Sequence, residues 1–251
     1  MSNVLIETRD LVKVYPDHNR GGEIRAVDGV NFQCTTGEIF GLLGLNGAGK
    51  TTTLRMLSTA LTPTSGTAVV NGFDVRNRAQ DVRASIGFLS GTTGLYHRLK
   101  AREMISYFGQ LHGLEGTALR ARVDQILQAF GVDKFADTRC EKLSTGMKQK
   151  VNIARTVVHD PPVLILDEPT SGLDVLAATT TQDFVRSSRD QGKCVLFSTH
   201  IMSEAERLCD RIAIIHEGII RTIGTLDELR RSSGLHYLED IFRQIVKGVP
   251  A

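Results

Sequence analysis

The sequence predicts an α/β fold with a mostly parallel sheet, an N-terminal antiparallel β region and an inserted α-helical subdomain. Three observations support this prediction. Short apolar runs alternate with helical patterns before residue 90 and again after about residue 160, which is typical of a parallel sheet covered by helices. Polar and apolar residues alternate near the N-terminus, as in antiparallel strands. Between about Gly91 and Asp160, apolar residues recur at helical spacing instead.

The composition sets the broad class of protein. The chain has 251 residues, of which 41% are hydrophobic and 23% charged, enough to bury a core. A formal net charge of +2 gives no electrostatic reason to expect nucleic acid as a partner. No apolar run is long enough to span a bilayer, and a signal-peptide pattern is lacking. The four cysteines form no C-x-x-C pair, so we expect reduced structural thiols in a cytoplasmic protein.

The N-terminal region is expected to be antiparallel. Residues 4–15 alternate well enough for one or two strands, and the polar residues 16–23 predict a turn or an exposed loop. Residues 26–34 and 67–71 read as two further strands.

The chain is organised around residues 41–53, GLLGLNGAGKTTT. Gly44, Gly49, Lys50 and Thr51 fill the pattern G-x-x-x-x-G-K-[ST] of a phosphate-binding loop. Glycines allow successive backbone N–H groups to point at phosphate oxygens, and the following helix directs its positive end at the same anion. A buried strand over 38–43 should feed the loop and a helix over 52–61 should leave it. This setting favours a P-loop NTPase core over a glycine-rich turn with a chance lysine.

Each residue of this loop has an expected task. Lys50 would reach the β- and γ-phosphates, and the Thr51 hydroxyl would hold Mg²⁺. The candidate nucleotide-binding residues of the loop are Gly44, Leu45, Asn46, Gly47, Ala48, Gly49, Lys50, Thr51 and Thr52.

The rest of the chain divides into three expected parts. Residues 1–90 and 161–235 would form the nucleotide-binding core, 91–160 the helical subdomain, and 236–251 a C-terminal amphipathic helix and tail. The expected core strands after the loop are 86–89, 163–166, 194–198, 212–215 and 219–223, the last two joined as a hairpin through Glu217-Gly218. The expected core helices are 80–85, 175–189 and 201–208.

Three helical faces carry apolar side chains, which most often means packing in a core. They are Met104, Ile105, Phe108 and Leu111; Val123, Ile126, Leu127 and Phe130; and Leu238, Ile241, Phe242, Ile245 and Val246. For the last face, packing on its own domain and contact with a partner both remain open.

Polar residues follow two of the buried strands. Asp167 directly follows the strand 163–166, at the carboxyl edge of the sheet and beside the phosphate loop. We expect its carboxylate to hold Mg²⁺. Glu168 is placed to orient or deprotonate the attacking water. His200 follows the strand 194–198 at the same edge, where a neutral imidazole could contact the γ-phosphate; the alternative is a solvated loop residue. The catalytic candidates are therefore Glu168, His200 and Lys50.

With these motifs, residues 1–247 resemble the ATP-binding subunit of an ABC transporter. The family's signature LSGGQ appears as LSTGM at 143–147, SGLD at 171–174 matches the D-loop, and His200 matches the switch histidine. The resemblance implies ATP and Mg²⁺ as cofactors. It also implies that Ser144, Thr145 and Gly146 bind the γ-phosphate and that Tyr15 stacks on adenine.

The resemblance further implies partners. Two ATP-binding subunits, expected to be two copies of this chain, would form a head-to-tail dimer that sandwiches each ATP between the P-loop of one and the signature of the other. A separate transmembrane permease would hold the subunit at the cytoplasmic face of the membrane, and no nucleic acid is expected. The motifs are similar to exporters of the ABC-2 type and, within those, to sodium-export (Nat-type) ATP-binding proteins.

Other functions remain open on the sequence. An ABC-2 exporter of a drug, haem, a lipid or a polysaccharide would carry the same motifs. A soluble ABC ATPase acting on nucleic acid or ribosomes is disfavoured, because the chain has one P-loop and no basic patch. A P-loop small-molecule kinase is disfavoured by the signature and the D-loop.

The chain departs from the family pattern at several positions. Thr145 replaces a glycine and is tolerable if its φ stays negative, and Met147 replaces a glutamine and is expected to pack under its helix. Gly91 stands where the family has a glutamine that contacts Mg²⁺, so the metal should keep an extra water or take a hydroxyl from Ser90 or Thr92.

The permease is expected to dock near 94–99, where the helical subdomain meets the core. Leu95, Tyr96 and Leu99 are apolar residues of that segment. The alternative is that they only cap the core of the subdomain.

Overall fold

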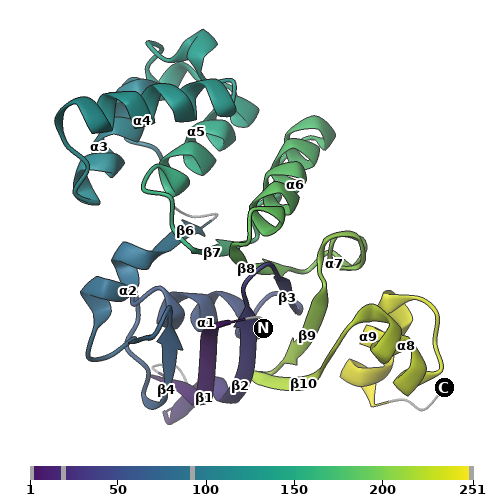
Figure 1. Cartoon of the computed structure of the whole chain (residues 1–251). Coiled ribbons are helices and arrows are strands. Elements are labelled where there is room, and N and C mark those ends of the chain that lie inside the picture. Colours follow the sequence, from purple (N-terminus) through teal and green to yellow (C-terminus); the bar gives the residue numbers. More distant parts are fainter. Residues whose placement is uncertain (1–2, 18–20, 91–93, 249–251) are drawn as a thin grey trace.

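Two β-sheets and the helices between and above them form layers in a computed structural model that describes residues 3–17, 21–90 and 94–248 (Figure 1). The first sheet is antiparallel, with strand order β2 (Glu23–Thr35), β1 (Val4–Pro16), β4 (Ser65–Val70) and β5 (Phe73–Asp74). This arrangement confirms the antiparallel N-terminal region, with residues 4–15 in one long strand.

The second sheet is mostly parallel and carries the site. Its strand order is β10 (Ile219–Gly224), β9 (Arg211–His216), β3 (Ile39–Leu43), β8 (Cys194–Thr199), β7 (Val163–Asp167) and β6 (Ile86–Ser90). Only β10 runs antiparallel among the paired strands described, in the predicted hairpin with β9. The α/β prediction is thereby confirmed.

Both faces of this sheet are buried, which explains the continuous apolar runs of its strands. Along β7, Leu164 and Leu166 join a cluster on one face, whereas Val163 and Ile165 join a cluster on the other. Successive side chains of a strand point to opposite faces, so each face receives alternate residues.

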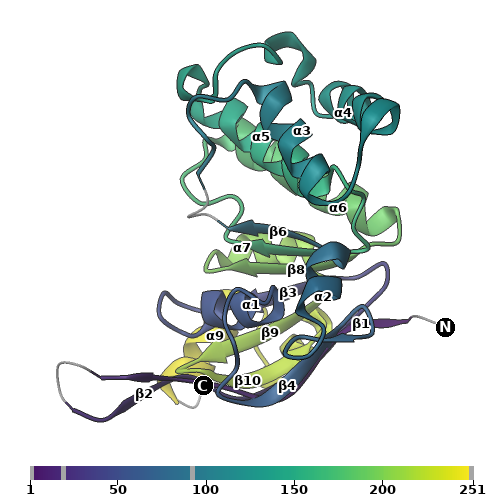
Figure 2. The same ribbon diagram turned by 90° about the vertical axis from the view of Figure 1, so that its left-hand side faces the viewer.

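Helix α1 (Lys50–Leu57) lies between the two sheets (Figure 2). It begins two residues before the expected helix 52–61, because the phosphate loop leads directly into it from Gly49. It also ends earlier than expected. Thr59 has a φ of 62°, in the left-handed region, which stops the helical path.

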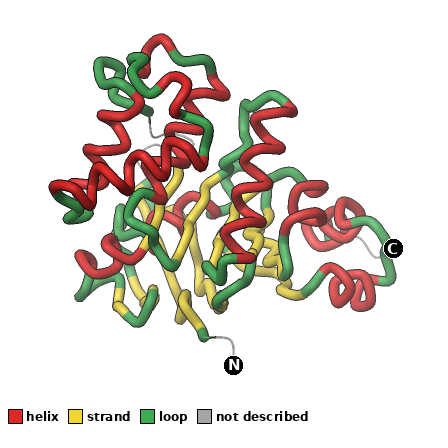
Figure 3. Tube along the Cα trace, turned by 45° about the horizontal axis from the view of Figure 1, so that its top comes forward, coloured by secondary structure: helices red, strands yellow, loops and turns green. Residues whose placement is uncertain are grey.

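Helices α3 (Ala101–Leu111), α4 (Gly116–Ala129) and α5 (Thr145–Val157) gather above the second sheet, beside α6 (Val175–Asp190) (Figures 1 and 3). Buried residues of these helices form one continuous cluster with the upper face of the sheet. Most of the predicted apolar residues are in this cluster, but Leu111 is 62% exposed because it ends α3. The boundaries 91–160 of a helical subdomain stay a prediction.

The C-terminal residues complete the core beside β3 and β9, on the same face of the second sheet as α3, α4 and α5. Helix α7 (Met202–Leu208) packs with α8 (Leu226–Ser233) and α9 (Leu238–Lys247) around a third buried cluster. The remaining core helix, α2 (Ala79–Ser85), lies directly before β6 in the chain. The apolar face of α9 packs on its own domain: Leu238 and Ile241 are at most 1% exposed. We did not predict α8, whose start is a capping box of Thr225 and Glu228 rather than an apolar stripe.

Two 3₁₀ turns, η1 (Asp133–Phe135) and η2 (Cys140–Lys142), lie between α4 and α5 in the chain.

Across the residues that the structure describes, no helix has both the length and the hydropathy to cross a bilayer.

A stacked histidine pair lies where α3 and α5 end against β6. The ring centroids of His112 and His159 are 3.5 Å apart, and His159 Nε2 lies 3.0 Å from the Ile86 carbonyl oxygen. Burial lowers the pKa of His159 to about 4, and the neighbouring His112 and Lys193 add to this, whereas Asp160 opposes it.

This low pKa predicts a loss of stability in mild acid. Below the ordinary histidine value of 6.5 the unfolded chain binds a proton at His159 that the folded chain does not. The free energy of unfolding should therefore fall as the pH is lowered from about 6.5 to about 4. Thermal denaturation at several pH values should show a smaller dependence for His159→Gln, whereas the exposed control His236→Gln should behave as wild type. Equal slopes for His159→Gln and wild type would contradict this account.

Candidate functional site

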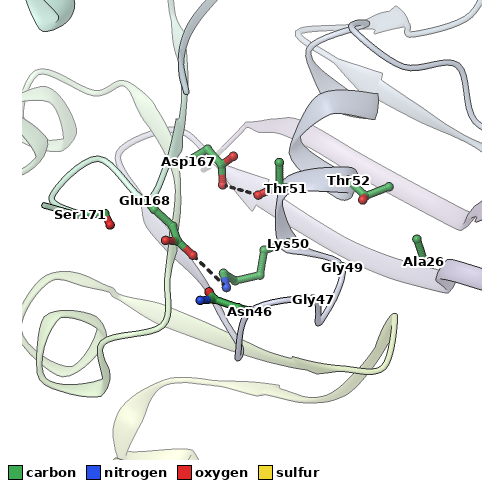
Figure 4. A pocket seen from close by; sticks show the side chains of 10 residues that line it. All are labelled: Ala26, Asn46, Gly47, Gly49, Lys50, Thr51, Thr52, Asp167, Glu168 and Ser171. Carbon is green, nitrogen blue, oxygen red and sulfur yellow. Dashed lines mark hydrogen bonds and ion pairs between the residues drawn. The ribbon is translucent and has the colours of Figure 1, made fainter. Parts of the chain in front are cut away.

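A cavity of about 490 Å³ opens between the loop after β3 and the carboxyl end of β7 (Figure 4). Its lining residues are Ala26, Asn46, Gly47, Gly49, Lys50, Thr51, Thr52, Asp167, Glu168 and Ser171. The two candidate motifs, more than a hundred residues apart in the chain, thus face one space.

Glycines shape the loop because other residues would not fit. Gly49 has a φ of 107°, and a Cβ built on it would lie 2.6 Å from the Ala26 carbonyl oxygen. A Cβ on Gly44 would lie 2.5 Å from the carbonyl oxygen of Ile215. Helix α1 then starts at Lys50, so its free N–H groups and positive dipole end border the cavity. This arrangement suits a phosphate group.

Lys50 is held tightly although it carries a charge. Its side chain is 4% exposed, and its Nζ donates to the carbonyl oxygens of Gly44 at 2.8 Å and Leu45 at 3.2 Å. The same Nζ lies 3.1 Å from Glu168 Oε1 (Figure 4). The ammonium therefore bridges the phosphate loop and the acid that follows β7.

Thr51 and Asp167 lie together, as the sequence predicts for two ligands of one Mg²⁺ ion. Thr51 Oγ1 donates to Asp167 Oδ1 at 3.1 Å, and the carboxylate is 5% exposed. Hydroxyl and carboxylate oxygens are the ligands that Mg²⁺ prefers, and Mg²⁺ usually takes only one or two of them from a protein. The described residues contain no group of three or more His, Cys, Asp or Glu side chains suited to a metal. The pair fits Mg²⁺ that shares its remaining positions with water and phosphate.

Glu168 lies between the two other candidate catalytic residues. Its Oε2 is 3.2 Å from His200 Nδ1, a buried atom that makes no hydrogen bond of good geometry with the residues that the structure describes. Burial would raise the pKa of Glu168, but Lys50 and His200 outweigh this effect and the pKa is lowered. The carboxylate is thus ionised near neutral pH.

The turn that presents His200 is fixed by a buried carboxylate. Thr199 Oγ1 donates to Glu204 Oε2 at 2.9 Å and accepts from the Ile201 backbone N–H at 3.0 Å. Gln182 of α6 donates to the other oxygen of Glu204 at 3.4 Å. We did not predict Glu204 as a residue of the site, although it lies only four residues after His200 in the chain.

The signature residues lie outside the phosphate cavity of this chain. Ser144 caps α5 by accepting from the Met147 backbone N–H at 3.3 Å. Ser144 and Gly146 line a second cavity, of about 290 Å³, with Asp174 and Leu176 of the segment that starts α6. Thr145 is not among the described residues with a positive φ, as its tolerance at this position requires. Met147 packs against the buried cluster that α3, α4 and α5 form with the second sheet, as expected.

Two expected contacts remain predictions. Tyr15 is half-buried on β1, opposite Ile24, with the Lys13 ammonium 5.3 Å from its ring centre, and it does not line the phosphate cavity. Its contact with adenine stays a prediction. Gly91 lies outside the described residues, so the replacement of the family's glutamine also stays a prediction.

The segment 94–99, where we predict that the permease docks, has both buried and exposed residues. Leu95 is 8% exposed and Leu99 packs against the same buried cluster, so both cap the core of the upper helices. Tyr96 is 54% exposed, with its ring edge-on to Tyr107 at 5.8 Å between centroids. Of these three residues, Tyr96 is the exposed one.

Comparison with known proteins identifies the class. Residues 27–171 match the family model described as ABC transporter. The chain is 40% identical over 230 residues to the ABC transporter ATP-binding protein NatA of Bacillus subtilis, covering 90% of this chain and 93% of that protein. The chain belongs to the ABC transporter family, as one of its ATP-binding proteins.

Other relatives include named exporters and resistance proteins. A daunorubicin/doxorubicin resistance ATP-binding protein of Streptomyces peucetius is 39% identical over 233 residues, covering 93% of this chain and 69% of that protein. The chain spans 38% of the probable multidrug ABC transporter ATP-binding protein YbhF of Escherichia coli, at 37% identity over 229 residues.

Solved structures share the fold. A structure of the ATP-binding subunit of an ABC transporter aligns with a TM-score of 0.84 and 31% identity, over 96% of this chain and 99% of that one. The ATP-binding cassette MJ0796, a dimer bound to ADP and Pi after hydrolysis, aligns with a TM-score of 0.79 over 88% of this chain and 98% of that one. At 24% identity, that second likeness shows the fold alone.

Proposed function

We propose that the chain binds and hydrolyses ATP and powers a membrane exporter. The observation that carries this proposal is the contact of Glu168 with both Lys50 and His200, beside a cavity that Lys50, Glu168, Thr51 and Asp167 line together. Phosphoryl transfer to water requires a cation, a general base and ligands for a metal ion around a phosphate-binding loop, and the site has all of these.

In this arrangement Lys50 acts as the sensor of phosphate. Without an anion its charge is satisfied by Glu168 and by two carbonyl oxygens of the loop. A triphosphate in the cavity competes with Glu168 for the ammonium. Release from Lys50 removes the main opposite charge that lowers the pKa of Glu168, which makes the carboxylate a better base for water.

The two candidate metal ligands and the histidine complete the site. Thr51 and Asp167 would hold Mg²⁺, which offsets the negative charge of the phosphates. His200 supplies a ring nitrogen beside Glu168 and would contact the terminal phosphate.

We further propose that the working unit is a dimer. Ser144 and Gly146 border a separate cavity of this chain, so with Thr145 between them they would bind the ATP held by a second copy. Val175 and Leu176, next to that cavity, are about 80% exposed and would be covered by the second copy. A membrane permease is the other partner, and it would hold this chain at the cytoplasmic face.

For the cargo we propose sodium ions, on the resemblance to sodium-export ATP-binding proteins and the extensive match to NatA. A drug is the second candidate, since relatives of similar identity are named for daunorubicin resistance. The test is efflux from vesicles that contain this chain with the permease encoded beside it. ATP-dependent export of ²²Na⁺ would support sodium; export of daunorubicin without sodium would replace it. Co-purification with RNA instead of a membrane protein would favour a non-transport ATPase.

Tyr96→Ala tests the docking surface. Because the Tyr96 side chain is 54% exposed, the variant should fold normally and keep the ATPase activity of the isolated chain. Transport per ATP hydrolysed should fall in reconstituted vesicles, since a partner contact is lost. An exposed aromatic away from this segment, Tyr237→Ala, is the matched control. Unchanged stoichiometry in the Tyr96 variant would count against docking here.

A further inference from the structure

Ser198 contacts both acids of the site with one hydroxyl. It lies on β8 directly opposite Asp167 of β7 and is fully buried. Its Oγ donates to Asp167 Oδ1 at 2.8 Å and accepts from the backbone N–H of Glu168 at 3.1 Å. A single side chain is thereby connected to the carboxylate of one acid and to the main chain of the other.

The contact with Asp167 determines how that carboxylate faces the cavity. Thr51 Oγ1 donates to the same oxygen, Oδ1, so two hydroxyl donors from the described residues converge on one side of the carboxylate. Oδ2 is left as the oxygen that can accept from water bound to a metal. Ser198 belongs to a central strand, which holds its hydroxyl in place. Thr51 must itself bind the metal, so Ser198 is the donor that can orient Asp167 while the metal is bound.

The contact with Glu168 holds a strained conformation. Glu168 has a φ of 47°, in the left-handed region that is unfavourable for a residue other than glycine. Its N–H is shared between Ser198 Oγ at 3.1 Å and the Ser198 carbonyl oxygen at 3.2 Å. These bonds keep the carboxylate of Glu168 directed at Lys50 and His200.

We propose that Ser198 is a positioning residue that sets the orientation of Asp167 toward Mg²⁺ and the backbone of Glu168 toward water. This inference rests on the proposed ATPase function. It requires a hydroxyl at this position, because only a group that both donates and accepts can serve the carboxylate and the N–H together.

The sharpest test compares Ser198→Thr with Ser198→Val. The two variants add side chains of nearly the same shape in the fully buried site, but only threonine retains the hydroxyl. Ser198→Ala removes the hydroxyl without added volume. Ser188→Ala is the control, because Ser188 is 3% exposed and its hydroxyl donates only to a local helix carbonyl, that of Phe184.

Binding is measured with fluorescent ADP, in EDTA and over a Mg²⁺ titration. Loss of a group that orients a metal ligand typically costs about 10–100-fold in metal affinity. Ser198→Ala and Ser198→Val should therefore need about 10–100-fold more Mg²⁺ for half-maximal tightening of ADP binding. Affinity in EDTA should not change, and kcat should fall more than KM rises. Ser198→Thr and Ser188→Ala should stay near wild type.

The outcomes separate the two proposals. Equal Mg²⁺ dependence in the Thr and Val variants, or wild-type behaviour of Ser198→Ala, would overturn the role of Ser198. An equal loss of ADP affinity in EDTA would also overturn it, because that would report a general structural effect. If the wild type binds ADP without any influence of Mg²⁺, the proposed function itself fails.

Discussion

Glu168→Gln should lower ATP turnover by about 10²–10⁴-fold, the usual cost of removing a general base. Glutamine keeps the size of the side chain but cannot accept the proton of the attacking water. Nucleotide binding should be retained or slightly tightened, because the carboxylate that competes with phosphate for Lys50 is gone. Steady-state hydrolysis and ATP binding by the same preparation are the measurements.

The Glu168 variant should also accumulate as an ATP-bound dimer on gel filtration. Hydrolysis would normally release the two subunits, and the variant cannot take that step. Glu115→Gln, which replaces an exposed acid at the start of α4, is the control and should remain a monomer with normal turnover. A Glu168 variant that hydrolyses ATP at the wild-type rate and stays monomeric would show that another group is the base.

Lys50→Ala should abolish hydrolysis and weaken ATP binding by about 10–100-fold, the equivalent of one charge-assisted hydrogen bond. The variant removes the cation opposite the phosphates and leaves Glu168 with a charge repelling them. Calorimetric ATP binding and steady-state turnover provide the measurements.

A folding control is needed because Lys50 is buried. Its Nζ also donates to two carbonyl oxygens of the loop, so thermal denaturation must show that the variant folds. Lys134→Ala removes an exposed lysine outside the site and should change neither property. Unchanged affinity and turnover in a folded Lys50 variant would refute the role of Lys50.

The sequence by itself predicts the fold class and the parts of the site. Continuous apolar runs predict the central strands β3, β7 and β8, because strands buried on both faces need no polar residues. The glycines of the loop follow from backbone geometry: the positive φ of Gly49 and its approach to Ala26 exclude a side chain. Asp167 follows from its place at the end of a strand.

Local patterns are weaker where the stabilising contacts are distant. Helix α8 has few apolar residues, so its periodicity is faint, and its capping box and contact with α9 support it. For α9 the periodicity is clear, but it does not reveal what covers the apolar face; the third buried cluster does. Likewise, Leu95 and Tyr96 are adjacent apolar residues of opposite exposure.

Tertiary structure alone decides how the site is connected. The register of β7 against β8 places Ser198 opposite Asp167, and a shift of one residue would turn its hydroxyl to the other face of the sheet. The bonds of Lys50 to Glu168 and of Ser198 to both acids join residues 118 and 30 or 31 positions apart in the chain. No local pattern encodes such pairs, because they form only when separate strands end at the same edge of one sheet.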